Sequence, residues 1–524
     1  MATNLAKNTD VPLWSKSRGQ TDTILKEIVC NYLDTATTSF GRATHYNTRE
    51  EQQKAELSSH KAMLNFDRDL YALFSVLPGT TDRASQIVTK NLLANPRNGM
   101  RSKVLDSEME AKVIYHLINE LPPQRIFKIF AAFKDGDEKQ GISKANNART
   151  RKLILKTILG SNKLELWSVK YRNNMKKALT HAWGESKTGI IRTILGKTKW
   201  NAKDRSIIEQ NLTKYASKKK STLECIAFVL DSKRPWTLPL IKAFGDAKKN
   251  LNKGKQLPIE VLEGIRSTYH PNTPSAKVME LKKDSLTKKQ QKNLQATAKK
   301  ANVKVDFDPM NYEAIELYLY GFERGFTNDI FGALNHKAMS AAEGFPEKFE
   351  SIGIILDGSK SMYGDQTQPL RPLAAVLAIR DMLVFTSTTA YEVHATSIPT
   401  NQELKPCGDT ELASHLIDLL KKDVQTIFVL SDGYENAPAG RFGEVLEAAR
   451  SIGIDTPVYH INPVYAAEVG GVRELAPKLA TTLPIQKPSA LSTTFIRGML
   501  EQDPVQAVNK LISMTYPKLL NGAR

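Results

Sequence analysis

The stretch SIGIILDGSKSMYG, residues 351–364, decides how the last third of this 524-residue chain folds. Its apolar run ends at Asp357, and Ser359 and Ser361 follow at alternate positions. The run predicts a short buried β-strand, and the polar residues after it predict a loop at the C-terminal end of that strand. One carboxylate and two hydroxyls in such a loop are oxygen ligands, which suit Mg²⁺ or Mn²⁺ better than softer metals. We therefore expect this loop to hold a divalent cation.

More apolar runs follow, and amphipathic helix patterns separate them. The predicted strands are 351–356, 391–396, 426–430 and 457–461, and the predicted helices between them are 373–385, 412–420 and 442–452. This alternation predicts a parallel, doubly wound α/β sheet. Ligands of such sheets bind at the C-terminal ends of the strands. Asp357 and Asp432 each directly follow a predicted strand, so we expect both carboxylates at the same edge of the sheet.

Three loops are expected to meet at that edge. The first carries Asp357, Ser359 and Ser361, the second is CGDT at residues 407–410, and the third is SDG at residues 431–433. Serine and threonine hydroxyls are weak neutral ligands, so a cation held by them keeps an open position. That position is suited to a carboxylate or another oxygen from a protein partner.

Residues 1–345 show one amphipathic helix pattern after another and almost no strand alternation. Pro122 and Pro123 separate predicted helices at 104–121 and 125–133, and a longer helix is predicted at 164–183. Short helices with short breaks predict an α-solenoid of stacked helical pairs. Because no fixed-length repeat is visible, a compact non-repeating helical domain is the alternative. We predict an all-helical domain over 1–345 and an α/β domain over 346–524.

The net charge of +19 is concentrated in the helical part. Residues 346–524 hold 16 Lys and Arg against 20 Asp and Glu, a net charge of −4. The residues before them hold 58 against 35, a net charge of +23. Such asymmetry indicates a polyanion partner, with a merely solubilising surface as the alternative. The lysine-rich stretch 277–304 is interpreted as either a solvated helix face or a basic insertion.

Several classes of protein are excluded by what the sequence lacks. It has no GxxxxGK[ST] phosphate loop, no HExxH and no zinc-type spacing of Cys and His. The acidic cluster in the helical part, Asp135, Asp137 and Glu138, is interpreted as a loop. Cys30, Cys225 and Cys407 lie far apart, which favours a reducing compartment. No run of 18 apolar residues and no signal-peptide core is visible, so we expect a cytoplasmic protein that has no membrane partner.

The motifs DGSKS, GDT and LSDG, in this order and after predicted strands, resemble those of the von Willebrand factor A domain. The resemblance implies a divalent cation in a metal-ion-dependent adhesion site. It makes Asp357, Ser359, Ser361, Thr410 and Asp432 the metal ligands. Asp409, beside Thr410, leaves the assignment in the second loop open. The alternative is the same fold with a vestigial site that serves only packing.

An A domain after a long basic helical region resembles the Ro ribonucleoproteins, which carry the TROVE module. SDGYEN at 431–436 is similar to that family's third metal loop, and VKYRN at 169–173 with LTH at 179–181 is similar to its RNA-presenting helix. The resemblance implies a ring of HEAT-like repeats closed by the A domain. It also implies binding of small structured noncoding RNAs, called Y RNAs, and of single-stranded ends of misfolded RNAs. Such proteins are scaffolds or chaperones, sometimes with an exoribonuclease, and are not enzymes.

Basic residues on the predicted helix 164–183 are the candidate RNA contacts. They are Lys170, Arg172, Lys176, Lys177 and His181, which helical spacing places on adjacent faces. Lysine and arginine there are expected to pair with phosphates, and Trp167 or Tyr171 to stack on a base. Core packing is the alternative for Trp167, Tyr171 and Trp183. The run Lys218, Lys219 and Lys220 is interpreted as phosphate contacts or as a solvated face.

A rival function from another class is a protein-interaction adaptor. Its A domain would recruit an acidic partner side chain through the cation, as in the A-domain partners of AAA+ ATPases. The charge split between +23 and −4 favours RNA, because an adaptor has no need of so basic a first part.

Overall fold

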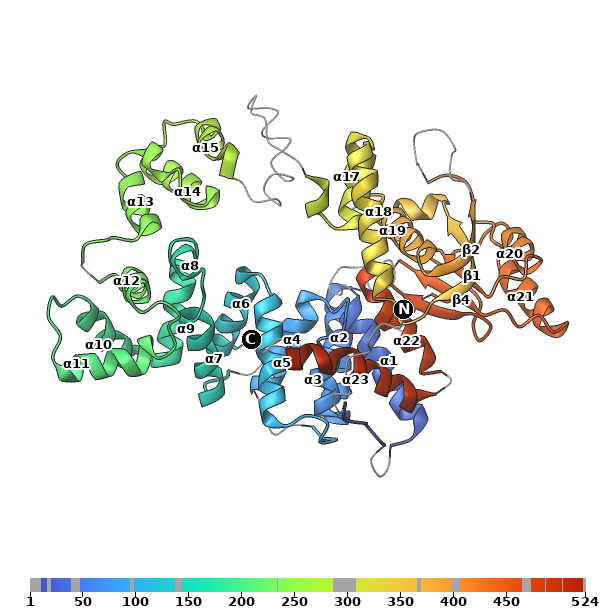
Figure 1. The fold of residues 1–524 in the computed structure, drawn as a ribbon, viewed down its shortest axis with the longest axis horizontal. Helices are drawn as coiled ribbons and strands as arrows, with labels where there is room; N and C mark the ends of the chain where they lie inside the picture. Colours follow the sequence, from blue (N-terminus) through green and yellow to red (C-terminus); the bar gives the residue numbers. More distant parts are fainter. Residues whose placement is uncertain are drawn as a thin grey trace, which may run out of the picture. The chain divides into compact units, whose positions relative to one another are not determined.

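The strands predicted around Asp357 form one parallel sheet (Figure 1). The structure is a computed structural model, and it describes residues 11–16, 20–38, 48–94, 99–136, 144–232, 234–285, 308–364, 369–396, 406–463, 473–485, 487–501 and 503–521. Within these residues the sheet has five strands in the order β2-β1-β3-β4-β5. They are β1 (Phe349–Asp357), β2 (Ser387–Thr396), β3 (Thr426–Leu430), β4 (Val458–Asn462) and β5 (Thr481–Pro484). The prediction of a parallel α/β sheet is confirmed.

Helices cover both faces of this sheet. Ile427 and Val429 of β3 pack on one face against Leu416 and Leu446, which lie on α20 (Ala413–Leu420) and α21 (Arg441–Ser451). On the other face, Phe495 of α22 (Leu491–Met499) contacts the rings of Phe349 and Tyr459, with centroids 6.1 and 5.1 Å away. Alternate residues of the central strand β3 therefore enter two separate cores, which is why this strand is buried along its whole length.

The chain divides into two compact units. The first, here called the sheet unit, comprises Met1–Val88, Arg97–Leu117 and Pro309–Arg524. The second, here called the helical unit, comprises Thr89–Pro96 and Ile118–Asp308. These units differ from the predicted ranges 1–345 and 346–524, because helices from both ends of the first range pack against helices that follow β1 in the sequence. The assignment of RNA binding to one range and metal binding to the other stays a prediction.

Further helices of the sheet unit come from distant parts of the sequence. They are α1 (Asp22–Thr37), α2 (Arg49–Phe66), α3 (Arg68–Phe74), α17 (Ala314–Arg324), α18 (Asn328–Glu343), α19 (Arg371–Val384) and α23 (Pro504–Asn521). α4 (Asp82–Ala94) and α5 (Ser107–Glu120) contribute residues to both units. The first helices are held to the last ones by polar contacts. Arg497 pairs with Asp34 (Nη2–Oδ2, 2.7 Å), and the backbone N–H of Trp14 donates to Asn509 (2.8 Å).

Helices make up the described part of the helical unit. They are α6 (Pro123–Asp135), α7 (Ala148–Leu159), α8 (Leu164–Lys170), α9 (Arg172–Trp183), α10 (Glu185–Leu195), α11 (Ala202–Ile208), α12 (Lys219–Val229), α13 (Pro239–Ala247), α14 (Ile259–Tyr269) and α15 (Ser275–Lys282). A helix-rich first part is confirmed. The repeats, the ring and the solenoid stay predictions. Asp137, Glu138 and residues 286–304 of the lysine-rich stretch lie outside the described residues.

The prediction of a single helix over 164–183 is wrong, because the chain leaves helical geometry at Tyr171. This residue has φ −121° and ψ 28°, and it ends α8 and precedes α9. Its ring packs against Phe127 of α6, with centroids 5.4 Å apart. The helix is therefore interrupted at the residue whose ring packs on α6, and the amphipathic pattern of the sequence does not reveal this interruption.

No helix in the described part of the chain is long and apolar enough to cross a membrane.

Candidate functional site

The adjacency of β1 and β3 brings two of the predicted loops together. Leu356 pairs with Leu430, so the residues that follow these strands lie side by side. Asp357 is the last residue of β1 and is fully buried. Ser431 follows β3, and its hydroxyl donates to Asp357 Oδ2 over 2.6 Å. The sheet thus fixes one oxygen of the Asp357 carboxylate.

The first loop folds back on its own aspartate. The backbone N–H of Ser359 donates to Asp357 Oδ1 over 2.9 Å, an Asx-type turn. The hydroxyl oxygens of Ser359 and Ser361 lie 3.0 Å apart. The Ser361 hydroxyl also hydrogen-bonds the Asp432 carboxylate of the third loop. The alternate spacing of the serines therefore places both hydroxyls beside the two carboxylates.

The second loop is fastened to the other two by backbone hydrogen bonds. The N–H of Cys407 donates to the carbonyl of Gly358 over 3.0 Å. Thr410, 1% exposed, donates its backbone N–H to Asn436 Oδ1 over 2.8 Å. Asn436 was not predicted to matter, although it stands in the quoted SDGYEN motif. All three predicted loops therefore meet at one edge of the sheet.

The two carboxylates of this site have raised pKa values. Burial raises the pKa of Asp357, although the hydrogen bonds of Ser431 and Ser359 oppose this. Burial, and then the charge of Asp357, raise the pKa of Asp432 to about 6. A divalent cation between two such carboxylates would relieve their repulsion.

The donors at this site fit a hard cation. Two carboxylates and three hydroxyls, those of Ser359, Ser361 and Thr410, provide oxygen atoms only, which suits Mg²⁺ or Mn²⁺. Among the residues that the structure describes, no three His, Cys, Asp or Glu side chains are grouped so as to hold a metal. The candidate site therefore depends on its hydroxyls.

An arginine beside the carboxylates was missed by sequence reasoning. The guanidinium of Arg473 lies over the ring of Tyr434, with Cζ 3.1 Å from the ring centroid. Its charge lowers the pKa of Asp432, against the larger effect of burial. No sequence motif surrounds Arg473. Its position beside Tyr434 and Asp432 can be recognised only in the folded chain.

The predicted RNA contacts have protein partners in the helical unit. Lys170, at the end of α8, pairs with Glu260 (Nζ–Oε1, 2.9 Å). Arg172 and Lys176, on α9, both pair with Asp231, over 2.5 and 2.8 Å. The structure thus brings Arg172 and Lys176 together, and it gives Lys170 a different carboxylate.

The other two candidate RNA contacts, Lys177 and His181, differ in whether they have a partner within the described residues. Lys177 is exposed and forms no ion pair within the described part of the chain. His181 lies with Nε2 3.0 Å from the carbonyl oxygen of Ala145, so its ring already has a hydrogen-bond partner. Trp167 and Trp183 are 7% and 9% exposed, which confirms the core-packing interpretation for both tryptophans.

Asp231 is a further residue that sequence reasoning missed. It follows α12 with a left-handed φ of 59°, and it faces Arg172, Lys176 and the charge of Arg192. Burial raises its pKa, but Lys176 and Arg172 lower the pKa overall. Arg172 has a second anchor, because it donates to the carbonyl of Phe228 (2.7 Å) and lies over that residue's ring (4.1 Å). One carboxylate therefore faces three cations.

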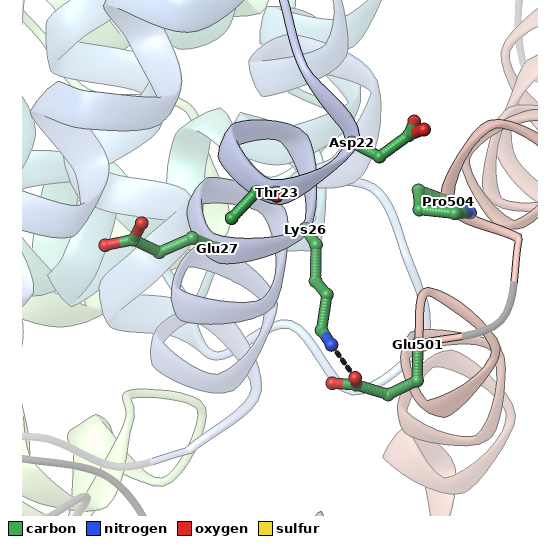
Figure 2. A pocket seen from close by; sticks show the side chains of 6 residues that line it. All are labelled: Asp22, Thr23, Lys26, Glu27, Glu501 and Pro504. Carbon is green, nitrogen blue, oxygen red and sulfur yellow. Dashed lines mark ion pairs between the residues drawn. The ribbon is translucent and has the colours of Figure 1, made fainter.

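Two surface pockets differ in charge. On the helical unit, one pocket is lined by Lys218, Lys219, Lys220, Ser221, Glu224, Thr237 and Leu238. Its acid, Glu224, already accepts hydrogen bonds from the backbone of Thr237 and Leu238. On the sheet unit, Figure 2 shows a pocket lined by Asp22, Thr23, Lys26, Glu27, Glu501 and Pro504, where Lys26 pairs with Glu501. The first pocket suits an anion and the second does not.

The difference in net charge between the two compact units is larger than the difference between the two predicted ranges. The helical unit holds 42 Lys and Arg against 17 Asp and Glu, a formal charge of +25. The sheet unit holds 32 against 38, a formal charge of −6. All of the excess positive charge therefore belongs to the helical unit.

No family model matches this chain, and no curated protein matches it. Among solved structures, it is similar to the crystal structure of the Ro (RSR) protein of Deinococcus radiodurans. The alignment covers 92% of this chain and 99% of that chain, with a TM-score of 0.40 and 12% sequence identity. A likeness of this size does not assign the chain to a family, so its proposed function rests on its own residues.

Proposed function

We propose that this protein binds RNA through its helical unit. The observation that carries the proposal is the division of charge, +25 on the helical unit against −6 on the sheet unit. A surface of that charge attracts the phosphate backbone and releases its counterions. The basic pocket at Lys218, Lys219 and Lys220, together with Lys177, supplies lysines for such contacts.

The finer proposal concerns the kind of RNA and the role. The motifs at 169–173 and 179–181 resemble those of Ro proteins, which supports small structured RNAs and single-stranded RNA ends as ligands. The role is that of a scaffold or chaperone, and not that of an enzyme. Arg172 and Lys176 are phosphate contacts in this proposal, and Lys170 and His181 are positioned by Glu260 and Ala145.

A second function is proposed for the sheet unit, on a separate observation. The carboxylates of Asp357 and Asp432 and the hydroxyls of Ser359 and Ser361 lie together at the ends of β1 and β3, and Thr410 lies on the loop fastened beside them. This arrangement supports a Mg²⁺ or Mn²⁺ site with an open position. When bound, the cation would attract an oxygen ligand such as a carboxylate of a protein partner. Asp357 and Asp432 would hold the cation, the hydroxyls of Ser359, Ser361 and Thr410 would complete its protein ligands, and Arg473 would add positive charge beside it.

The test of RNA binding uses the full chain. A labelled hairpin RNA with a single-stranded 3′ tail is titrated with protein between 50 and 300 mM salt. We expect affinity to fall steeply with salt, with a log–log slope that corresponds to several phosphate contacts, each worth about 0.7 in a single strand. Failure to bind at the lowest salt refutes the proposal. Equal affinity for a DNA duplex of the same length refutes its RNA part and leaves a general polyanion binder.

A further inference from the structure

A pair of histidines lies on the sheet unit, apart from the five oxygen-bearing side chains. His394 belongs to β2, the edge strand, and His415 belongs to α20. Their Nδ1 atoms face each other at 3.4 Å, and their rings are nearly perpendicular, at 78°. The side chain of His394 is 17% exposed, so an ion in solvent can reach the pair.

The other ring nitrogen of His394 already has a hydrogen-bond partner. Its Nε2 lies 2.8 Å from Oε1 of Glu392, which stands two residues earlier on the same face of β2. Glu392 is held in turn by an ion pair with Lys422 (2.5 Å), which is the contact of an ionised carboxylate. An ionised carboxylate requires a proton on Nε2, so the neutral ring presents the lone pair of Nδ1 to His415. Metal-binding histidines are commonly oriented by such a carboxylate.

The distance between the two nitrogens matches the distance between two ligands of one metal ion. A separation of 3.4 Å is longer than the usual range of about 2.7–3.2 Å for a hydrogen bond from nitrogen. Two nitrogens that each lie about 2.0–2.1 Å from one tetrahedral Zn²⁺ are separated by about 3.4 Å. The separation of the two Nδ1 atoms therefore equals that of two nitrogen ligands on one tetrahedral ion.

We propose that His394 and His415 bind one transition-metal ion of the Zn²⁺ class through their Nδ1 atoms. Nitrogen donors select such an ion over Mg²⁺, so the pair and the oxygen site would hold different metals. In the described residues no third His, Cys, Asp or Glu completes a cluster, so water or an external ligand takes the remaining positions.

The test is a Zn²⁺ titration of the full chain in excess Mg²⁺, with a colorimetric chelator as competitor. We expect one Zn²⁺ equivalent in the wild type and in Asp357→Ala, which lacks a carboxylate of the oxygen site. His394→Ala and His415→Ala should each weaken that equivalent at least about tenfold, since loss of an outer partner alone typically costs tenfold or more. His336→Ala, which removes an exposed histidine elsewhere, is the matched control and should bind as the wild type does.

Glu392→Gln provides a second variant that keeps both ligands. It should weaken Zn²⁺ binding by about ten- to a hundredfold, because Nε2 loses its carboxylate partner. This variant decides the matter if either alanine variant fails to fold, as judged by circular dichroism. Absence of a Zn²⁺ equivalent in the wild type overturns the proposal. The proposal is also overturned if His394→Ala and His415→Ala bind Zn²⁺ as tightly as the wild type does. Loss of the Zn²⁺ equivalent in Asp357→Ala overturns it as well.

Discussion

The carboxylate site of the sheet unit and the cationic cluster of the helical unit differ in how far the protein neutralises its own charge. Asp357 and Asp432 form no ion pair within the described residues, and burial together with mutual repulsion raises the pKa of Asp432. Arg172 and Lys176, by contrast, already share Asp231. A cation would stabilise the two carboxylates, whereas a phosphate that binds Arg172 and Lys176 would have to displace Asp231. A count of charges alone does not reveal this difference.

Removal of the first-loop aspartate should have the largest effect. Asp357→Ala deletes a buried carboxylate, so the protein should lose its Mg²⁺-dependent stabilisation completely. In the wild type, Mg²⁺ at about 100 times its dissociation constant should add about 2.7 kcal/mol to the free energy of unfolding. Thermal melts with and without Mg²⁺ measure this. Asp455→Ala, which removes an exposed acid of the same unit, is the control, and a Mg²⁺ shift that survives in Asp357→Ala contradicts the site.

The pH dependence of Mg²⁺ binding should come next. The pKa of Asp432 is raised to about 6, so this carboxyl takes up a proton as the pH falls below that value. A proton competes with the cation, and the apparent Mg²⁺ affinity should fall about tenfold for each pH unit below about 6. Titrations between pH 7.5 and 5 check it. Asp432→Asn should bind more weakly and without this pH step, and an identical step in that variant would show that another group titrates.

Removal of the basic pocket should reduce RNA binding by a smaller amount. If Lys218, Lys219 and Lys220 each contact a phosphate, their joint replacement by alanine should lower the log–log salt slope by about two. The matched control replaces Lys54, Lys61 and Lys421, three exposed lysines of the sheet unit, and so makes the same change in net charge. Equal losses in both triple variants would mean that overall charge, and not the pocket, governs binding.

The neutralisation of Asp231 should have the smallest effect and the opposite sign. Asp231→Asn frees Lys176, while Arg172 keeps its bond to the Phe228 carbonyl, so RNA affinity should rise about two- to fivefold, in keeping with an exposed ion pair. Asparagine tolerates the left-handed backbone of this position, so the fold should be kept. Unchanged affinity in a protein that does bind RNA would show that Arg172 and Lys176 do not contact it.

The features that could be predicted from the sequence are those that depend on residues close together in the chain. The strand before Asp357 and the one before Ser431 were visible because both are continuous apolar runs, and their parallel pairing made the meeting of the three loops foreseeable. β5 was missed because four residues ending in Pro484 give too short a pattern. Asp231 was missed as the partner of Arg172 because 59 residues separate them, and no periodicity encodes such a contact.

The contacts of Trp14 with Asn509 and of Asp34 with Arg497 span 495 and 463 residues. The helical unit, by contrast, is nearly continuous in sequence, from Ile118 to Asp308 with one short additional piece. On a ribosome, the helical unit can therefore fold while the first helices of the chain still wait for partners that have not been synthesised. Buried surfaces of α1 and α3 would stay exposed until α22 and α23 emerge. Chaperone dependence during synthesis is thus expected to concentrate in the sheet unit.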